Sequence, residues 1–367
     1  MKNKFKVGIA GMGRGASFIR PFEVITETEV TAICDPRQEV LDRVSGEYNI
    51  PNKFKEYEDM LKSDVDIVVL ATPENLHVPQ SIAALEAGKH VISEVTAAVS
   101  LDQCYDLVRA VKKAKTKYMM AENQVYWTQN LVLKNMVQKG LFGDVYYGEG
   151  EMLHDIKFLH KDAQGNPTWR YYWQVGINRC NYATHSLGPV MSWFNERVVS
   201  VCCQGTGKHT DPEKGMDDTV VMMCKTEKGG LIKIRIDMLS NRPPNTFYAL
   251  QGTKGSFEGT RGMGDERKIW LSDLWPDAGW HAFKDIEKDF LPDMLKNPPE
   301  EVVRAGEQEN SEYYEMRDFV DSILNDTEPP FGIYYAMDLT MPGIMSEESI
   351  KRGGAPVEVP DFRKMDI

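Results

Sequence analysis

The sequence predicts an α/β and α+β chain of two domains, and three observations point to this class. A short apolar strand near the N-terminus runs directly into a glycine turn. The first 124 residues then alternate strand-like and helix-like segments, which indicates a parallel sheet with helices on both faces. Beyond about residue 145, longer runs alternate polar with apolar residues, as antiparallel strands do. We therefore expect a doubly wound parallel sheet in residues 1–124 and a large, open, mostly antiparallel sheet in residues 125–367.

The glycine turn predicts a bound dinucleotide. Residues 5–16 read FKVGIAGMGRGA, so the turn follows a strand and precedes a plausible helix. Gly11 permits the tight turn, Gly13 lets the backbone approach a pyrophosphate, and the small Ala16 allows close helix packing. An acidic residue, Asp35, ends the next strand about 20 positions further on, as this fingerprint requires. The turn residues expected at the cofactor are Gly11, Met12, Gly13 and Arg14.

Asp35 indicates which dinucleotide binds. Its carboxylate can accept hydrogen bonds from the adenosine ribose hydroxyls and repels a 2′-phosphate, which favours NAD over NADP. Arg37 keeps a second interpretation open, because a guanidinium two residues later can pair with a 2′-phosphate. An exposed arginine at the mouth of a loop is, however, more often a solvated charge.

The expected strands follow from apolar runs and alternation. In the first domain they are 30–34, 66–71, 90–95 and 118–122, with a helix over 78–87 that Gly88 ends. In the second domain they are 145–153, 198–204, 219–225, 231–239, 247–251 and 268–271. Residues 276–309 are rich in charge and proline, and we expect a long surface excursion there. A broad open sheet commonly packs against a second copy, so we expect a homodimer or homotetramer formed through the second domain.

Composition excludes several classes of partner. The 367 residues carry a formal net charge of −12, whereas nucleic acids and anionic membranes attract basic patches. The first strand begins by about residue 5, which leaves no room for a signal segment, and no run approaches the roughly 20 apolar residues of a membrane span. The six cysteines show no metal-ligand spacing. We expect reduced, mostly buried cysteines, no metal site and a cytoplasmic location.

Three segments resemble the Gfo/Idh/MocA family of sugar and inositol oxidoreductases. They are DIVVLATPENLH at 66–77, HVISEVTAAV at 90–99, where that family has a Glu-Lys-Pro motif, and GTKGS at 252–256. The resemblance implies NAD as cofactor and a small carbohydrate as substrate. It places Glu94 on the nicotinamide side and the residues after the 66–71 strand beside the nicotinamide ribose. The latter are Thr72, Pro73, Asn75 and His77, although Asn75 can instead form an Asx turn and His77 a helix cap.

Val95 departs from the family pattern. It stands where typical members carry a lysine that contacts both the nicotinamide and the reacting hydroxyl, and a valine can do neither. The segment Glu94-Val95-Thr96 resembles the Glu-Val-Pro-type segment of the NAD-dependent α-N-acetylgalactosaminidases of glycoside hydrolase family 109, except that Thr96 stands in place of the proline. Residues 119–126, 150–155 and 182–189 resemble the same branch. In that branch NAD oxidises the sugar at C3, the aglycone is eliminated, water adds, and the same hydride returns.

Oxidation of a secondary alcohol needs a base that titrates near neutrality, and histidine is the natural candidate. His185 stands out because Tyr182 and Asn181 precede it by three and four residues, which places all three on one face of a helix. Tyr182 can accept the proton itself or stabilise an oxyanion, and Asn181 is a candidate for binding substrate. The alternative interpretation of His185 is a capping or core histidine.

Further candidates lie outside this segment. His154 ends the first strand of the second domain beside Asp155, although adjacent strand residues point in opposite directions and a surface turn is the alternative interpretation. Trp169 and Arg170 can stack on a sugar face and bind its hydroxyls, or instead belong to a helix that buries its aromatic residues. The resemblance adds Tyr126 to the substrate-binding candidates.

These observations lead to a primary expectation and two alternatives. We expect an NAD-dependent dehydrogenase that acts on a secondary hydroxyl of a sugar or glycoside by hydride transfer to the nicotinamide, with C3 as the expected position. The main alternative is an NAD-dependent glycosidase or lyase that oxidises C3 transiently and recycles the cofactor. A sensor that binds NAD without catalysis is the third interpretation.

Overall fold

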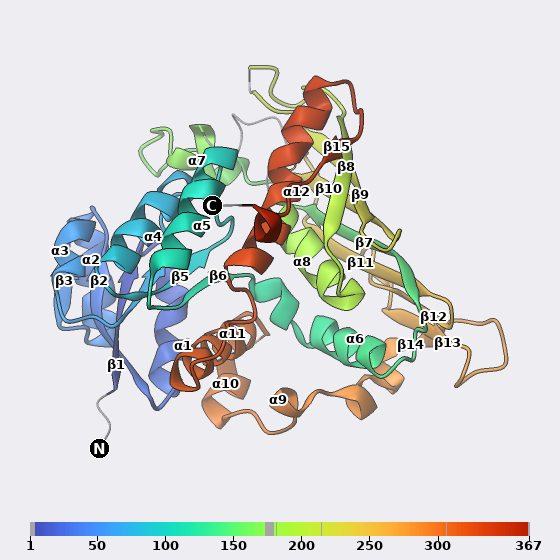
Figure 1. Cartoon of the computed structure of the whole chain (residues 1–367), viewed down its shortest axis with the longest axis horizontal. Coiled ribbons are helices and arrows are strands. Elements are labelled where there is room, and N and C mark those ends of the chain that lie inside the picture. The colour runs from blue at the N-terminus through green and yellow to red at the C-terminus, as the bar shows by residue number, and fades with distance from the viewer. Residues whose placement is uncertain (1–3, 173–179, 181, 214, 306, 366–367) are drawn as a thin grey trace. The chain divides into compact units, whose positions relative to one another are not determined.

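The computed structural model describes residues 4–172, 180, 182–213, 215–305 and 307–365. The chain divides into two compact units. The first comprises Met1–Trp127, Asn297–Met337 and Phe362–Ile367, and the second comprises Thr128–Lys296 and Asp338–Asp361. Figure 1 traces this path by colour, from blue at the N-terminus to red at the C-terminus. The C-terminal segments of the first unit show that neither unit is one continuous stretch of sequence.

The first unit contains the predicted parallel sheet. Its order is β3-β2-β1-β4-β5-β6, and every neighbouring pair is parallel. The strands are β1 (Phe5–Ala10), β2 (Thr28–Cys34), β3 (Asn52–Phe54), β4 (Ile67–Leu70), β5 (His90–Glu94) and β6 (Tyr118–Ala121). Its helices are α1 (Ile19–Val24), α2 (Gln38–Tyr48), α3 (Tyr57–Leu61), α4 (His77–Glu86) and α5 (Leu101–Lys113). The doubly wound sheet is thereby confirmed, and β3 is the strand that the apolar pattern did not reveal, since none of its three residues is buried.

Two C-terminal helices complete the first unit. They are α10 (Glu300–Ala305) and α11 (Glu307–Leu324), which lies beside α1. The face of α11 that includes Met316, Phe319 and Val320 is fully buried. A backbone bond from Met120 in β6 to the carbonyl of Phe331, 3.0 Å long, ties the following segment to the sheet. The long helix α12 (Ile333–Lys351) then leads from the first unit into the second.

The second unit contains the predicted open sheet. Its order is β14-β13-β12-β11-β7-β10-β9-β8-β15, and within it only β7 and β10 pair in parallel. The strands are β7 (Val145–Leu153), β8 (Val198–Gly205), β9 (Thr219–Thr226), β10 (Leu231–Asp237), β11 (Asn245–Gly252), β12 (Gly255–Glu258), β13 (Lys268–Leu271), β14 (His281–Ala282) and β15 (Val357–Glu358). Its helices are α6 (Thr128–Gln138), α7 (Trp169–Tyr172), α8 (Ala183–Phe194) and α9 (Asp293–Lys296).

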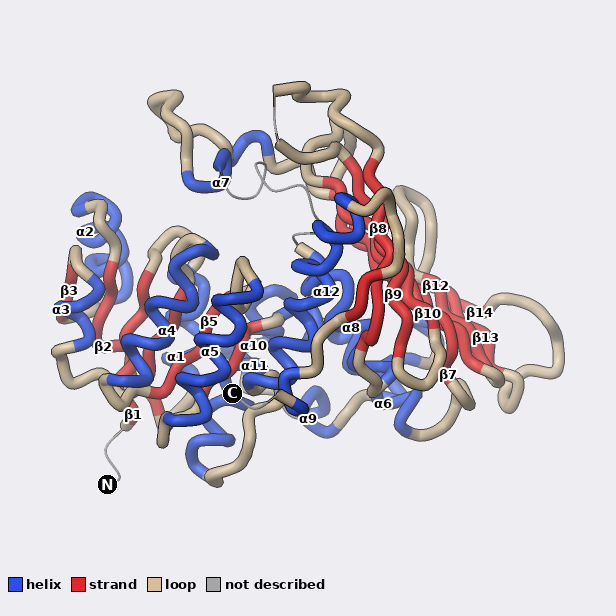
Figure 2. Tube along the Cα trace, turned by 45° about the horizontal axis from the view of Figure 1, so that its top comes forward, coloured by secondary structure: helices blue, strands red, loops and turns tan. Residues whose placement is uncertain are grey.

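Helix α8 covers one face of this sheet. Figure 2 shows it in blue beside the red strands, and its main neighbours are β7 and β10. Gly150 of β7 allows the approach, because a Cβ at this position would stand 2.1 Å from the carbonyl oxygen of Ser186. The indole of Trp193, fully buried, donates to the carbonyl of Asn130 in α6 over 3.0 Å. The helix is therefore fixed from both sides, and so is the position of its N-terminal turn.

The expected surface excursion at 276–309 is wrong in part. Phe283 is fully buried and packs edge-on against Phe257 of β12, with ring centroids 5.1 Å apart. Val302 in α10 is also buried. A single buried apolar residue can anchor a segment that is otherwise rich in charge, and a single residue produces no periodic pattern in the sequence that would predict its burial. Within the described residues, no helix combines the length and apolarity needed to cross a membrane.

Candidate active site

The glycine turn has the shape that a dinucleotide requires. Gly11 has φ +88°, and a Cβ there would stand 2.4 Å from the carbonyl oxygen of Ala71, so only glycine fits. A Cβ on Gly13 would meet nothing within 4 Å, which leaves the backbone of the turn open to a ligand. The close-packed small residue is Gly15, where a Cβ would lie 2.8 Å from Ile9. The turn therefore fits a pyrophosphate bound by its backbone N–H groups.

Asp35 and Arg37 form an ion pair just after the end of β2. Asp35 is buried and accepts hydrogen bonds from the backbone N–H of Met12 over 3.0 Å and of Arg37 over 3.1 Å. The Arg37 guanidinium binds both oxygens of the carboxylate. Burial alone would raise the pKa of Asp35, but the bonds from Arg37 outweigh it and hold this pKa below its ordinary value. Asp35 is therefore an ionised acceptor beside the glycine turn, which fits an adenosine ribose.

His77 joins the two loops that follow β4 and β5. Its Nδ1 lies 2.8 Å from the carbonyl oxygen of Thr96, and its Nε2 lies 2.9 Å from that of Thr72. The ring is buried, and His77 is the first residue of α4. Pro73 precedes a short 3-10 turn that contains Asn75, whose carbonyl accepts a bond from Gln103. In this structure His77 fixes the loop, and contact of these residues with the nicotinamide ribose stays a prediction.

Glu94 ends β5 and is bound to the glycine turn. Its Oε1 accepts a bond from Nε of Arg14 over 2.5 Å, and its Oε2 accepts one from the backbone N–H of Val95 over 3.1 Å. Arg14 also donates to the carboxylate of Glu312 in α11 and, over 2.7 Å, to Ser17. Burial alone would lower the pKa of Arg14, but Glu94 and Glu312 outweigh it and raise this pKa. Val95 is buried beside this group, and the Val95–Thr96 peptide bond is cis.

Sequence reasoning missed Glu312 entirely. It is 298 positions from Arg14 and belongs to a helix whose sequence carries no cofactor motif. Glu315 lies one turn further along α11, fully buried. Burial, with the carboxylates of Glu94, Glu122 and Glu312 nearby, raises the pKa of Glu315 well above its ordinary value. Only the folded chain brings these residues to the glycine turn.

In the second unit, Tyr182 and His185 lie together at the start of α8. Their ring centroids are 5.5 Å apart and their planes are tilted by 34°. Tyr182 is the N-cap of the helix and His185 its third residue, and both are half-buried. The hydroxyl of Tyr248 in β11 donates to the backbone carbonyl of His185 over 2.7 Å, which fixes the first turn to the sheet. Asn181, the third member of the predicted group, lies outside the described residues.

His154 and Asp155 directly follow β7. The backbone N–H of His154 donates to the carbonyl of Asp237 over 2.8 Å, and its ring lies 6.3 Å from that of Phe158. Asp155 forms an ion pair with Lys157 at 3.1 Å and accepts a bond from the Lys157 backbone. The carboxylate is thus engaged by a lysine, and a catalytic role of His154 stays a prediction.

The remaining substrate candidates differ in exposure. In α7 the Arg170 guanidinium lies over the ring of Trp169, 4.4 Å from its centroid, and neither residue is buried. Tyr126 is buried, and its hydroxyl donates to Asp318 of α11 over 2.8 Å. Burial, with Asp318 beside it, raises the pKa of Tyr126 well above its ordinary value. Trp169 and Arg170 are half-buried, whereas Tyr126 is buried with an internal partner, and all three roles stay predictions.

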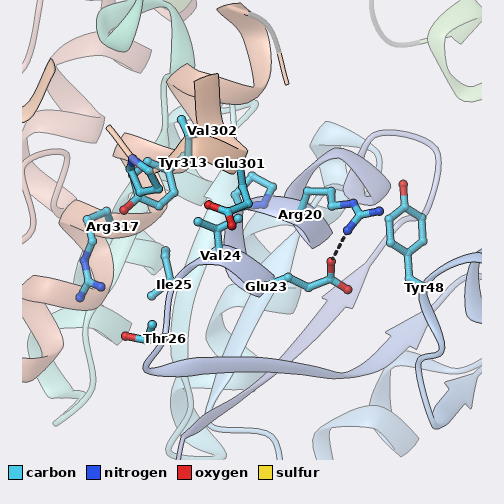
Figure 3. Close-up of a pocket in the computed structure, with 12 residues that line it drawn as sticks. Arg20, Glu23, Val24, Ile25, Thr26, Tyr48, Glu301, Val302, Tyr313 and Arg317 are labelled. Carbon is cyan, nitrogen blue, oxygen red and sulfur yellow. Dashed lines mark hydrogen bonds and ion pairs between the residues drawn. The ribbon is translucent and has the colours of Figure 1, made fainter. Parts of the chain in front are cut away.

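The first unit also contains an open pocket of about 960 Å³. Figure 3 shows that α1 supplies one side, with Arg20 and Glu23, and the C-terminal helices the other, with Tyr313 and Arg317. Arg20 pairs with Glu23 at 3.1 Å, and Arg317 pairs with Glu27 and Asp321. None of the turn residues 11–14 lines this pocket. We assign no ligand to it.

The described residues include no group of three or more histidine, cysteine, aspartate or glutamate side chains arranged to hold a metal ion. The six cysteines form no disulfide bonds with one another, and all but Cys202 are buried. Each unit therefore contributes its own candidate groups: the first a glycine turn that fits a dinucleotide, and the second a histidine–tyrosine pair.

Comparison with known proteins agrees with this description. A model described as "Oxidoreductase family, NAD-binding Rossmann fold" matches residues 5–122, and one described as "GFO/IDH/MocA C-terminal domain" matches residues 131–258. A third, "Glycosyl hydrolase 109, C-terminal domain", matches residues 204–366. Together these models cover both units.

Individual relatives extend over nearly the whole chain. A glycosyl hydrolase family 109 protein of Shewanella pealeana is 27% identical, over 98% of this chain and 85% of that protein. An α-N-acetylgalactosaminidase of Shewanella oneidensis has the same identity and coverage. Among solved structures, an oxidoreductase domain protein from Kribbella flavida has a TM-score of 0.83 at 18% identity, over 98% of this chain and all of that one. Levoglucosan dehydrogenase, in complex with NADH and levoglucosan, has a TM-score of 0.80 at 19% identity, with the same coverage. The chain belongs to the Gfo/Idh/MocA oxidoreductase family, with the NAD-binding Rossmann domain of that family at residues 5–122, and its C-terminal part is similar to that of glycosyl hydrolase family 109.

Proposed function

We propose that this chain oxidises a secondary alcohol of a glycoside by taking a hydride from its carbon, with C3 as the expected position, and uses this oxidation transiently to cleave the glycoside. The observation that carries the proposal is Val95, which follows Glu94 at the end of β5. A buried valine supplies no proton acceptor where typical family members have a lysine. The relatives named glycosyl hydrolase family 109 protein and α-N-acetylgalactosaminidase support cleavage as the net reaction.

The residues of the first unit fit NAD. The backbone of residues 11–14 would hold the pyrophosphate, and Asp35 the adenosine ribose. Thr72, Pro73, Asn75, His77 and Glu94 are the residues expected on the nicotinamide side. When bound, NAD supplies a hydride acceptor that can later return the hydride.

The residues of the second unit would move the protons. Loss of a hydride from C3 requires a base at the C3 hydroxyl, and His185 or Tyr182 is assigned this role, with His154 as the third candidate. The resulting ketone acidifies the C2 hydrogen. Removal of that proton by a base expels the aglycone from C1, and the aglycone oxygen takes up a proton. Water would then add its hydroxyl at C1 and a proton at C2, and a hydride at C3 with a proton on its oxygen would restore the alcohol. Atoms balance as glycoside plus water giving sugar plus aglycone alcohol.

Net dehydrogenation is the second candidate. Levoglucosan dehydrogenase, which has the same fold, supports it, because the same base at a sugar hydroxyl would serve an oxidation that ends at the ketone. The two candidates share the first step and differ in whether NADH accumulates.

One experiment separates the two candidates. The purified protein is incubated with NAD and a panel of nitrophenyl glycosides, including the N-acetyl-α-galactosaminide, while nitrophenol and NADH absorbance are recorded together. The proposal expects nitrophenol without accumulation of NADH, and deuterium at C2 of the sugar when the reaction runs in heavy water. NADH in equal amounts without nitrophenol would establish the dehydrogenase instead. Nitrophenol without deuterium at C2 would contradict the elimination.

We also propose that the sheet of the second unit joins copies of the chain. Its face opposite α8 carries half-exposed Leu231 and Val221 beside a charged group formed by Lys233, Glu149 and Glu151. Such a mixed face suits an interface between identical subunits. Light scattering after gel filtration would report a dimer or tetramer, and a monomer would contradict the proposal. A cytoplasmic location stays a prediction.

A further inference from the structure

The ion group formed by Arg14, Glu94 and Glu312 contains more negative than positive side chains. One guanidinium faces two carboxylates, those of Glu94 and Glu312. The side chain of Glu312 is fully buried, and that of Glu94 is 11% exposed. Burial raises the pKa of Glu312 above its ordinary value, and the direct pair with Arg14 offsets this effect in part. Two carboxylates paired with one guanidinium give this group one excess negative charge in a region that water hardly reaches.

The burial of Glu315 shows that solvent is excluded from this region. Its two carboxyl oxygens are buried and, within the described residues, make no hydrogen bond. It lies near Glu94, Glu122 and Glu312, so its own charge would add to theirs. A carboxyl in these surroundings is protonated rather than charged. Electrostatic interactions are stronger here than at the surface, because little solvent screens them.

The strand order places this group on the nicotinamide side. In a doubly wound sheet, the dinucleotide crosses the carboxyl end of the first strand. Asp35, which fits the adenosine ribose, directly follows β2 on one side of β1, whereas β4 and β5 lie on the other side. The second half of the dinucleotide therefore extends toward β4 and β5, and Glu94 is the last residue of β5. Arg14, directly after Gly13, links the turn to that strand end.

We propose that the Arg14–Glu94–Glu312 group makes the protein bind NAD+ more tightly than NADH, and that Glu312 of α11 is a positioning and charge-setting residue for this preference. The nicotinamide ring of NAD+ carries a positive charge that is lost when the ring accepts a hydride. A nearby net negative charge therefore stabilises the oxidised form selectively. Val95 acts in the same direction, because it supplies no positive charge where a lysine would. The inference rests on NAD binding and not on the proposed sugar chemistry.

The test compares the affinities of NAD+ and NADH in the absence of any sugar. Titration calorimetry and NADH fluorescence give both dissociation constants for the wild-type protein and for Glu312→Gln. We expect the preference for NAD+ over NADH to fall by about tenfold in the variant, as expected when one charge acts through a partly desolvated region. Glu312→Asp, which keeps the charge, should restore most of the preference.

Asp321→Asn is the matched control. It removes a carboxylate from the same helix, but from an exposed position paired with Arg317. An unchanged preference in Asp321→Asn together with a reduced one in Glu312→Gln supports the proposal. An equal weakening of both nucleotides in Glu312→Gln would show a merely structural role and overturn it, and so would an equal shift in Asp321→Asn. If Glu312→Gln does not fold, Glu94→Gln is judged by the same criterion. Because no glycoside is present, failure of the proposed cleavage leaves this result readable.

Discussion

The guanidinium of Arg37 donates one hydrogen bond to each carboxylate oxygen of Asp35, with Nε 2.8 Å from one oxygen and Nη2 2.9 Å from the other. The arginine that left NADP open in the sequence is thus already paired with the residue that favours NAD. Such bidentate pairs hold an arginine in a defined position.

This pair predicts how the cofactor preference would change. Asp35→Ser removes the carboxylate that accepts ribose hydrogen bonds and at the same time frees Arg37 for a 2′-phosphate. We expect NAD affinity to fall by about tenfold, since bonds to a charged acceptor are lost, while NADP affinity rises. Calorimetric titration with both cofactors checks this. The double variant with Arg37→Gln should lose the gain for NADP, and an unchanged NADP affinity in the single variant would contradict the prediction.

The histidine–tyrosine pair of α8 predicts a loss of turnover without loss of cofactor. His185→Ala and Tyr182→Phe should each reduce turnover by about 10² or more, the usual effect of removing an acid or base, while NAD still binds. Steady-state rates and NAD titration are the measurements. His209→Ala, an exposed histidine of the same unit, is the matched control and should keep its rate. Rates near the wild-type value in both variants would remove the assignment.

Gly150 predicts how tightly α8 must approach the sheet. Gly150→Ala would place a Cβ 2.1 Å from the Ser186 carbonyl oxygen, so helix or strand must move. We expect a loss of about 1–3 kcal/mol in the free energy of unfolding, typical of overpacking, together with reduced turnover because His185 shifts. Denaturant unfolding reports the first effect.

Gly46→Ala provides the comparison for that measurement. Gly46 is an exposed residue inside α2, and a Cβ there meets nothing within 4 Å. This variant should be stabilised by about 0.5–1 kcal/mol, because alanine loses less backbone entropy in a helix. If the two variants are equally stable, a Cβ at residue 150 fits between β7 and α8, and the prediction is wrong.

Glu315 predicts a pH dependence of stability. Its pKa in the folded protein lies well above the ordinary 4.5, so the folded chain retains a proton that the unfolded chain has already released. Its contribution to stability is therefore complete below about pH 4.5 and decreases as the pH rises toward its folded value. Glu315→Gln cannot titrate, so its stability should decrease less between about pH 5 and about pH 8. Thermal unfolding across this range is the measurement.

A surface carboxylate serves as the control for that slope. Glu348 on α12 is paired with Arg352 near the protein surface. Glu348→Gln should show the same pH dependence as the wild-type protein. If Glu315→Gln also follows the wild-type slope, Glu315 is ionised in the folded chain and the prediction is wrong.

Local patterns in the sequence determined much of the first unit. The glycine turn, Asp35 and the apolar strands are short-range features, because a tight turn needs glycine and a fully buried strand needs a continuous apolar run. The resemblance at residues 66–77 and 90–99 added the family, which the comparisons confirm. The alternating runs likewise predicted the strands of the open sheet, since one of its faces packs on α8.

Tertiary structure alone decided what surrounds these features. Arg14 and Glu312 are 298 positions apart. No local periodicity can predict this pair, because it forms only when α11 packs beside the glycine turn. The parallel pairing of β7 with β10, the commitment of Tyr126 to Asp318 and the anchoring of Phe283 have the same origin. A sequence pattern specifies which face of an element is apolar. Which distant elements come into contact depends on how those apolar faces pack together in the folded chain. The sequence by itself therefore determined that the chain binds NAD, and the fold decided which charges lie around Arg14 at the glycine turn.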